Sequence, residues 1–410
     1  MKKVLFICAL LTASSTMFAQ KYAVIDANTK LTEACRDSRN VDYRLVNQAW
    51  NDIQECMVHE KSKDYYDTWR VAAKIKNILT FKLYQDGQSS ANGLDTLQYF
   101  RGLSDILGYY SIYEKCLTTP NEKGKLPVKE GEYKELHKDA QTEAYSLRGN
   151  ILSGACAIVN SHPKEATELL DCYLGTFDDP LYKELKLNET DSLRESANLY
   201  YGMALKNMAR TWEDTLKYLT WYEKVLESPT YGTYTCVELM NTYKDHGDMV
   251  NWEKYCRYAA EHFNDVQFPK LLVQEYLHQG KNDEALKRCD EMAKLYPQEI
   301  YFVETKALMT FNDKKYTEAI EMFKKLLEID PTYGRAWTSL GTCYYQIAME
   351  KRNNIAECKK WLNEAIPCYK KSEECEPDQP VLWGNYLYRC YHALQDSANE
   401  KKYAKYKDAD

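Results

Sequence analysis

The stretch "YTEAIEMFKKLLEIDPTYGRAWTSLGTCYY", from Tyr316 to Tyr345, decides the fold of most of the chain. It joins two helical patterns across a single Asp330-Pro331 step. Proline has no amide hydrogen and its ring clashes with the preceding turn, so Pro331 ends the first helix. A second helix begins within four residues. The stretch therefore predicts two helices separated by one short turn.

The same spacing recurs along the chain. In three places an alanine is followed four residues later by a larger side chain and eight residues after that by a proline: Ala285-Cys289-Pro297, Ala319-Phe323-Pro331 and Ala365-Tyr369-Pro377. The first two alanines are 34 residues apart. Before the third alanine stands a first-helix pattern, Trp337-x-x-Leu340-Gly341-x-x-Tyr344. We expect the alanines and Gly341 where two antiparallel helices cross, and the aromatic residues Trp337 and Tyr344 between one hairpin and the next.

These residues resemble the tetratricopeptide repeat, whose pattern is W-x2-L-G-x2-Y, then A-x3-F, then P, with a period of about 34 residues. The resemblance implies an all-α fold, a right-handed α-solenoid of stacked antiparallel helix hairpins. It also implies a concave groove, lined by the first helix of each hairpin, that holds an extended peptide or a helix of a partner. The middle unit has the weakest first helix, with Lys306, Ala307 and Thr310 at the signature positions.

Outward from this core the pattern weakens. The stretch "YYDTWRVAAKI" near the start keeps part of the signature, and Gly149 and Gly202 are the expected small residues of degenerate hairpins. The predicted segments are a signal peptide over 1–19, a divergent N-terminal helical region with the first hairpin over 20–132, degenerate hairpins over 133–232, the repeat array over 233–379 and C-terminal capping helices over 380–410.

Three segments depart from the repeat. Between Tyr344 and Ala365 the chain has 12 extra residues of charged composition, which we expect to lengthen both helices of that hairpin. The stretch "YQDGQSSANGLD", residues 84–95, is rich in Gly, Ser and Asn and predicts a loop inside the first hairpin. The stretch "TTPNEKGKLPVKEGE", residues 118–132, is a candidate flexible linker.

The first residues, "MKKVLFICALLTASSTMFAQ", have the pattern of a secretory signal peptide. Lys2 and Lys3 precede an apolar run that is too short to span a membrane, and small residues precede a cleavage point after Ala19. Cys8 lies inside the apolar run, so we reject it as a lipid-attachment site. We therefore expect a periplasmic or secreted protein that is not a lipoprotein and has no integral membrane segment after cleavage.

Charge and cysteine content narrow the class of protein. The chain has 54 basic and 61 acidic residues, and cleavage removes two lysines, so the mature net charge is 52 minus 61, or −9. A mixed acidic surface argues against a nucleic-acid partner. Of the 14 cysteines, one lies in the signal peptide, which leaves 13. The remaining number of cysteines is odd, and several of them fall at apolar helix positions. Both facts favour buried thiols over a disulfide framework.

Motifs for catalysis and cofactor binding are absent from the sequence. None of H-E-x-x-H, G-x-S-x-G, G-x-x-x-x-G-K-[ST], G-x-G-x-x-G or C-x-x-C occurs. Cys56 and His59 are three residues apart and share a helical face, but two ligands without a partner pair do not make a zinc site. We predict no catalytic residue, no metal and no cofactor, and therefore no enzyme.

Four short triplets resemble the acceptor of a bacterial general O-glycosylation system: Asp95-Thr96-Leu97, Asp191-Ser192-Leu193, Asp214-Thr215-Leu216 and Asp396-Ser397-Ala398. The alternative is that these aspartates cap helix N-termini, and we favour it because the triplet is permissive. Together with the signal peptide, the triplets make the chain similar to exported repeat proteins of the Bacteroidetes-type envelope.

The resemblance also places the binding groove on two first helices. The residues there are polar, with Tyr345 as a possible aromatic anchor: Gln267, Lys270, Gln274, His278, Arg335, Thr338, Ser339, Thr342, Tyr345 and Gln346. They lack the Lys/Asn/Arg set with which some members of the family bind a C-terminal carboxylate.

We thus expect an exported, non-catalytic scaffold or adaptor that binds a protein or peptide. The alternative is a carbohydrate- or nutrient-binding protein, because the chain has 35 Tyr and 8 Trp, whose rings stack on sugars. It predicts aromatic side chains exposed together on one face, whereas the scaffold predicts them buried between hairpins. An enzyme whose site lies in the weakly matched first part of the chain is a third possibility, and it predicts a buried cluster of ionisable groups in a cleft.

Overall fold

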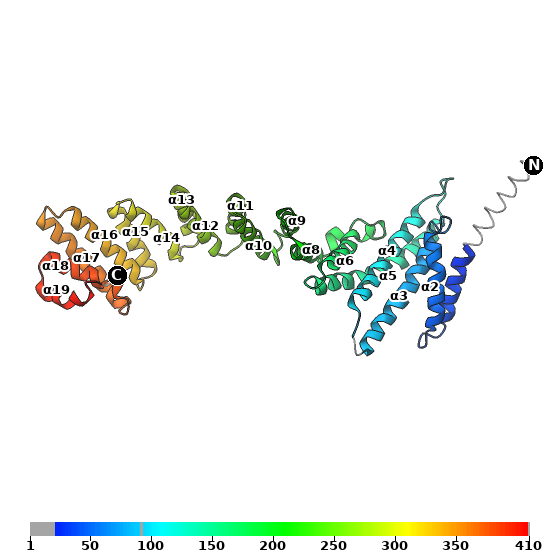
Figure 1. The fold of residues 1–410 in the computed structure, drawn as a ribbon. Helices are drawn as coiled ribbons and strands as arrows, with labels where there is room; N and C mark the ends of the chain where they lie inside the picture. Colours follow the sequence, from blue (N-terminus) through cyan, green and yellow to red (C-terminus); the bar gives the residue numbers. More distant parts are fainter. Residues whose placement is uncertain (1–20, 91–92, 409–410) are drawn as a thin grey trace, which may run out of the picture. The chain divides into compact units, whose positions relative to one another are not determined.

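The computed structural model describes residues 21–90 and 93–408, and within these ranges the chain forms helices and turns but no β-strand. The predicted signal peptide, residues 1–19, lies outside the described residues. The chain divides into two compact units, Met1–Val237 and Glu238–Asp410, and the division falls inside α10 (Gly232–Asp245) (Figure 1). In each unit, helices that follow one another in the sequence pack together as hairpins. The predicted all-α solenoid of helix hairpins is therefore confirmed.

The first unit begins with a helix over residues 21–34. Its other elements are α2 (Tyr43–Val58), α3 (Tyr66–Ser89), α4 (Thr96–Thr118), α5 (Glu130–Ile158), α6 (Pro163–Gly175), the 3₁₀ helix η1 (Pro180–Leu185), α7 (Leu187–Thr190), α8 (Arg194–Met208) and α9 (Trp212–Glu223). The predicted first hairpin, with its second helix ending before Pro120, corresponds to α3 and α4, which pack on each other. Ala72 and Ala73 are both completely buried, Ala73 in the core shared with α4 and Ala72 in the core shared with α2.

The second unit repeats one hairpin design. Its elements after α10 are α11 (Met249–His262), α12 (Gln267–His278), α13 (Asn282–Leu295), α14 (Ile300–Asn312), α15 (Tyr316–Ile329), α16 (Gly334–Glu350), α17 (Ile355–Cys375), η2 (Pro380–Leu382), α18 (Gly384–Leu394), α19 (Ser397–Tyr403) and η3 (Ala404–Tyr406). The prolines at 297, 331 and 377 each lie just beyond a second helix, at the turn before the next hairpin. The predicted break at Pro331 is confirmed by α15 and α16.

The turn inside each hairpin is the same at four places in the chain. A residue with positive φ ends the first helix: Gly247 (79°), Gly280 (70°), Lys314 (62°) and Gln395 (61°). The next amide then donates to the carbonyl five residues back, in the pairs Asp248–Tyr243 (2.9 Å), Lys281–Tyr276 (2.8 Å), Lys315–Thr310 (3.2 Å) and Asp396–Tyr391 (3.0 Å). This is the Schellman arrangement, which satisfies the last carbonyls of a helix and reverses the chain. Glycine is favoured there because a Cβ is strained at positive φ.

Lys314 therefore holds a strained backbone where two related turns have glycine. We expect Lys314→Gly to stabilise the protein by roughly 0.5–1 kcal/mol, since a left-handed residue with a Cβ costs about 1–2 kcal/mol and the freer unfolded glycine offsets part of the gain. The measurement is the midpoint of thermal unfolding. Lys325→Gly, in the middle of α15, is the control and should lower that midpoint. A lower midpoint for Lys314→Gly would contradict the turn assignment.

Small residues occupy the crossings inside the hairpins. Ala285, Ala319 and Ala365 are each completely buried. A Cβ added to Gly341 would lie 2.9 Å from the ring of Tyr369, which is closer than carbon atoms pack. Around Ala319 the core includes Phe323 and residues of α14 and α16, so one second helix contacts the first helices on both sides of it. The expected role of the alanines and Gly341 is confirmed.

Ala319→Phe tests this packing. An added ring has no space at a fully buried crossing, so we expect a loss of about 1–3 kcal/mol in the free energy of unfolding. Chemical denaturation followed by circular dichroism would measure it. The exposed neighbour Glu318 provides the matched control, because Glu318→Phe adds the same ring on the solvent side of α15. Equal stability of the two variants would show that Ala319 is not at the crossing.

Trp337 packs against the core shared by the hairpins α14–α15 and α16–α17, as expected, and it also closes a turn. It is half-buried, and its indole nitrogen donates to the carbonyl of Pro331 at 2.9 Å, which closes the turn between hairpins. In the first unit Trp69 does the same, donating to the carbonyl of Lys63 at 2.6 Å, also six residues earlier. In both places the tryptophan near the start of a first helix holds the preceding turn against that helix through its indole hydrogen bond.

Of three predictions about small segments, one was right in part, one was wrong and one was confirmed. The predicted loop over 84–95 is shorter than expected: α3 extends through Gly87, which packs closely on Leu94, to Ser89, and the described residues 90 and 93–95 are not helical. Gly149 contacts nothing beyond its own helix, whereas Gly154, one turn and a half later in α5, packs against the ring of Phe100. The insertion before Ala365 does lengthen both helices: α16 has 17 residues and α17 has 21, against 13 and 14 in α14 and α15.

Three of the four Asp-Ser/Thr triplets have a local structural role at a helix start. Asp95 and Asp396 are N-caps of α4 and α19, where their carboxylates accept from the amides of Gln98 and Asn399. Asp214 lies one turn inside α9 and forms a capping box with Thr211. The fourth, Asp191, follows α7 and has a buried partner described below. The capping interpretation is confirmed for the first two residues and is wrong for Asp191.

Candidate functional site: the first-helix face of the second unit

The residues predicted to line the groove lie on α12 and α16, two of the first helices of the second unit (Figure 1). Their exposure separates them into three classes. Gln267, Gln274, His278 and Arg335 are exposed; Lys270, Ser339, Thr342, Tyr345 and Gln346 are half-buried; Thr338 is buried. The predicted anchor Tyr345 packs against the core of the last hairpins, and burial raises its pKa.

Thr338 does not belong to a binding surface. Its side chain is buried, and its hydroxyl lies within hydrogen-bond distance of the Gly334 carbonyl, the Ser372 hydroxyl and the Leu382 carbonyl. The prediction for this residue was wrong, because the closing segment around Leu382 covers this part of α16. Thr342 is also engaged internally: it donates to the Thr338 carbonyl at 2.8 Å and accepts from the Tyr369 hydroxyl at 3.2 Å.

The middle hairpin supplies surface residues that the sequence analysis passed over. Adding 34 to Gln267, Lys270, Gln274 and His278 gives Tyr301, Glu304, Leu308 and Asn312, all on α14. They were missed because α14 lacks the Trp-Leu-Gly signature, although the 34-residue interval itself was a sufficient signal. We define the first-helix face by the exposed and half-buried residues of α12, α14 and α16: Gln267, Lys270, Leu271, Gln274, His278, Tyr301, Glu304, Leu308, Asn312, Arg335, Ser339, Thr342 and Gln346.

Charged side chains of this face join neighbouring first helices. Lys270 on α12 forms a 2.8 Å ion pair with Glu299, the N-cap of α14, and its ammonium lies 5.6 Å from the centre of the Tyr301 ring. Between α14 and α16, the Tyr333 hydroxyl donates to Glu304 at 2.8 Å. Burial, and then this carboxylate, raise the pKa of Tyr333 to about 12, so the hydroxyl stays a donor at neutral pH. These contacts fix the positions of α12, α14 and α16 relative to one another.

The exposed residues of the face combine polar side chains with two leucines and one arginine. Leu271 on α12 is 43% exposed and Leu308 on α14 is 41% exposed. Arg335, at the start of α16, is exposed. Large exposed apolar side chains on neighbouring elements are typical of contact surfaces when they lie beside polar groups. The face can therefore offer apolar contact and hydrogen bonds to a partner.

Two buried ionic clusters in the first unit were not predicted. In one, the Arg148 guanidinium of α5 lies 2.7 Å from the Asp191 carboxylate, with side chains only 4% and 7% exposed. Arg148 also donates to the Thr176 hydroxyl at 2.8 Å, and the Tyr173 hydroxyl donates to Asp191 at 2.8 Å. The guanidinium lies 4.7 Å from the centre of the Tyr173 ring. Arg148 and Asp191 are 43 residues apart in the sequence, and the spacing of the repeat gives no indication that they meet.

The second cluster joins α4 and α5. His137 lies 3.0 Å from Glu114, whose side chain is 2% exposed, and the Tyr133 hydroxyl donates to the same carboxylate at 2.7 Å. Gln141 donates to the carbonyl of Leu181 in η1 at 2.7 Å. Among the described residues, neither cluster lines the pockets that open beside α3, beside α4 or at the end of α2. Both clusters connect helices internally.

The Arg148–Asp191 pair makes a testable contribution to stability. Arg148→Met leaves a buried carboxylate without its partner, and we expect a loss of about 3–5 kcal/mol. Arg148→Met with Asp191→Leu removes both charges and should recover most of that loss. Denaturant unfolding of the two single variants and the double variant would complete the cycle. A double variant no more stable than Arg148→Met would contradict a direct pairing.

The same pair predicts the direction of pH dependence. Burial alone would raise the pKa of Asp191, but hydrogen bonds from the Leu193 amide, the Tyr173 hydroxyl and the guanidinium outweigh burial and lower that pKa. The stabilisation is therefore complete above the pKa of an unfolded aspartate, about 4, and is lost as the pH falls through the lower pKa of the folded state. The double variant should lose less stability between neutral pH and pH values near 3 than the native chain.

Other site types find no support in the part of the chain that the structure describes. Within residues 21–90 and 93–408, no three His, Cys, Asp or Glu side chains are placed to hold a metal ion. No helix in those ranges combines the length and the apolar character needed to cross a membrane. Cysteines of the hairpin cores have raised thiol pKa values, about 12 for Cys289 and Cys343, because burial disfavours the thiolate.

Comparisons with known proteins find likeness only among solved structures. No protein-family profile matches the chain, and no curated protein sequence matches it. A MamA double mutant (RS-1 ArsTM) is 15% identical, with 43% of this chain and 96% of that chain covered and a TM-score of 0.32. A human IFIT1 dimer with PPP-AAAA is 15% identical, with 92% and 75% covered and a TM-score of 0.30. The TPR2AB domain of yeast Sti1, in a complex with pHSP90, is 16% identical, with 80% and 99% covered and a TM-score of 0.24. At these values the likenesses assign no function to this chain.

Proposed function

We propose that the protein is an exported, non-catalytic scaffold that binds another protein or peptide through the first-helix face of the second unit. The observation that supports this most is the pair Leu271 and Leu308, 43% and 41% exposed on α12 and α14, with Arg335 exposed on α16. Exposed apolar side chains on neighbouring helices are typical of contact surfaces, and arginine is enriched among the residues that contribute most to binding. Export to the periplasm of a Bacteroidetes-type cell, or secretion, is part of the proposal and rests on residues 1–19.

The distribution of aromatic side chains favours a scaffold over a sugar-binding surface. The largest fully buried side chains are tyrosines, among them Tyr255 and Tyr369, packed in the hairpin cores. Tyrosines that are 38% or more exposed lie on separate helices: Tyr22, Tyr84, Tyr145 and Tyr234. None of these exposed tyrosines lies on α12, α14 or α16, so in the described residues the first-helix face has no exposed aromatic surface of the kind that the sugar-binding alternative requires. The excess of acidic over basic residues supports a protein partner over a nucleic acid.

Site-specific photocrosslinking in the native cells tests the proposal. A benzophenone amino acid placed at Gln274 or at Leu308 should crosslink to the same partner protein. Placed at Lys287 on α13 or at Lys325 on α15, positions of second helices, it should not. Because Leu308 would be central to the contact, Leu308→Glu should lower the yield from Gln274 about tenfold or more.

Lys325→Glu is the matched control, because it also introduces a glutamate but on a second helix. It should leave the crosslinking yield from Gln274 unchanged. Crosslinks of equal yield from Lys287 and Gln274, or a yield from Gln274 that Leu308→Glu does not change, would contradict binding through the first-helix face.

A further inference from the structure

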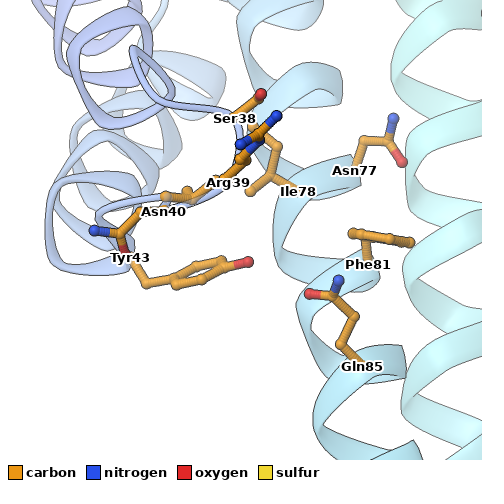
Figure 2. Close-up of a pocket in the computed structure, with 9 residues that line it drawn as sticks. Ser38, Arg39, Asn40, Tyr43, Asn77, Ile78, Phe81 and Gln85 are labelled. Atoms are coloured by element: carbon orange, nitrogen blue, oxygen red, sulfur yellow. The ribbon is translucent and has the colours of Figure 1, made fainter.

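A cavity of about 580 Å³ opens in the first unit between α3 and the turn that joins the helix over residues 21–34 to α2. Figure 2 shows its lining: Arg39, Asn40 and Tyr43 come from the turn and the start of α2, and Asn77, Phe81 and Gln85 come from α3. We call it the α3 pocket. Its volume lies in the range of small-molecule binding sites. It belongs to a different unit from the first-helix face, so a ligand in this pocket is independent of the proposed function.

The turn that forms one wall is fixed by its own hydrogen bonds. The Asp42 amide donates to the Ala34 carbonyl at 3.0 Å, which closes the turn at its base. The Asp37 carboxylate accepts from the Arg39 amide at 2.9 Å. The Asp42 carboxylate caps α2 by accepting from the amides of residues 44 and 45. Arg39 and Asn40 therefore project from a backbone that is already ordered.

The other wall is one face of α3. Asn77, Phe81 and Gln85 are spaced by four residues, so their side chains line up along the helix. Phe81 is 57% exposed, which is unusual for a phenylalanine in a chain whose aromatic rings are mostly buried. The ring of Tyr43 is covered by the Lys82 ammonium, 4.6 Å from its centre, and that lysine pairs with Asp86 at 2.7 Å. Phe81 is thus the open aromatic platform of the pocket.

The polar side chains of the pocket are exposed to solvent and are free to pair with a ligand. Throughout the ranges that the structure describes, no side-chain hydrogen bond or ion pair engages Arg39, Asn77 or Gln85. No carboxylate and no lysine lines the cavity, so the Arg39 guanidinium is its one lining charge. A guanidinium presents paired donors that match a carboxylate, and side-chain amides offer donors and acceptors together. This set fits a ligand with an apolar ring face, several hydroxyl groups and one negative charge.

We propose that the α3 pocket binds a saccharide that carries a carboxylate, a uronate unit. The apolar face of the sugar ring packs on Phe81. The amides of Asn77 and Gln85 exchange hydrogen bonds with the hydroxyl groups. Arg39 pairs with the carboxylate across the cavity, as its position opposite α3 allows (Figure 2). A neutral sugar would leave the guanidinium unpaired, and a simple carboxylate would leave Phe81 and the amides unused.

Saturation-transfer NMR with matched sugars tests the pocket. The probes are D-glucuronate with D-glucose, D-galacturonate with D-galactose, and acetate, each at about 10 mM because single sugars bind weakly. At least one uronate should receive saturation several-fold more strongly than its neutral counterpart and than acetate. Arg39→Gln should weaken uronate binding about tenfold, as expected for the loss of a charge-assisted pair, and leave the neutral sugars unchanged. Phe81→Ala should abolish uronate binding.

Matched controls lie close by. Arg36→Gln removes an exposed arginine of the same turn that does not line the cavity, and Tyr22→Ala removes an exposed aromatic ring elsewhere in the unit; neither should change uronate binding. Absence of uronate signals from the native protein would overturn the proposal. So would uronate binding that Arg39→Gln does not weaken, or acetate binding as strong as uronate binding and equally sensitive to Arg39→Gln. The substituted side chains are exposed, and circular dichroism would verify that each variant folds.

Discussion

The close approach of the two helices in each hairpin is the constraint on which the rest of the second unit depends. Ala285, Ala319 and Ala365 are completely buried, and a Cβ at Gly341 would lie 2.9 Å from the Tyr369 ring. In four of the hairpins, among them α12–α13 and α14–α15, a Schellman turn with positive φ joins the two helices. Between hairpins, Pro331 ends the second helix, and the hydrogen bond from the Trp337 indole to its carbonyl holds the turn that leads to the next hairpin. Each hairpin thereby buries one face against its neighbours and leaves the outer side of the first helix free to vary.

The abundance of tyrosine follows from the same geometry. Tyrosine rings fill the space at two crossings, Tyr369 beside Gly341 and Tyr222 beside Gly202. Other tyrosines place a hydroxyl against a carboxylate of a neighbouring segment. The pairs recur through both units: Tyr133–Glu114, Tyr173–Asp191, Tyr201–Asp171, Tyr276–Glu253, Tyr333–Glu304 and Tyr403–Glu373, at 2.7–2.9 Å. Burial and these carboxylates raise the phenol pKa, to about 12 for Tyr276, so the hydroxyl remains a donor. Phenylalanine would fill the volume but leave the carboxylate unpaired, which accounts for the preference for tyrosine.

Sequence reasoning succeeded where the determinant is local and periodic. The ends of α15 and α16, the crossing alanines and the lengthening of α16 and α17 follow from proline chemistry and from spacing. It failed where the determinant is a contact between distant residues. Thr338 has a surface position in the repeat pattern, yet the later segment around Leu382 covers it. Gly154, not Gly149, faces Phe100, because α5 is too long for the repeat register to hold along it.

The candidate sites were predictable to different degrees. The face on α12 and α16 came from the resemblance, and α14 could have been added from the 34-residue interval alone. The α3 pocket could not have been found this way. Arg39 and Phe81 carry no motif, and only the folded turn brings them to the same cavity. The functional assignment therefore rests on exposure and unpaired polar groups, which are properties of the structure.

Hydrogen–deuterium exchange by mass spectrometry of the intact chain tests the central claim most directly. If hairpins with tight crossings build the second unit, peptides from the middles of α12 to α17 should exchange slowly. Peptides that include residues 296–299 and 330–333 should exchange faster, because these are the turns between hairpins. Slow and fast peptides are expected to alternate in the order of the sequence. Slow exchange that continues through the turn at Pro331, or fast exchange through the middle of α15 around Ala319, would contradict tight crossings as the basis of the fold.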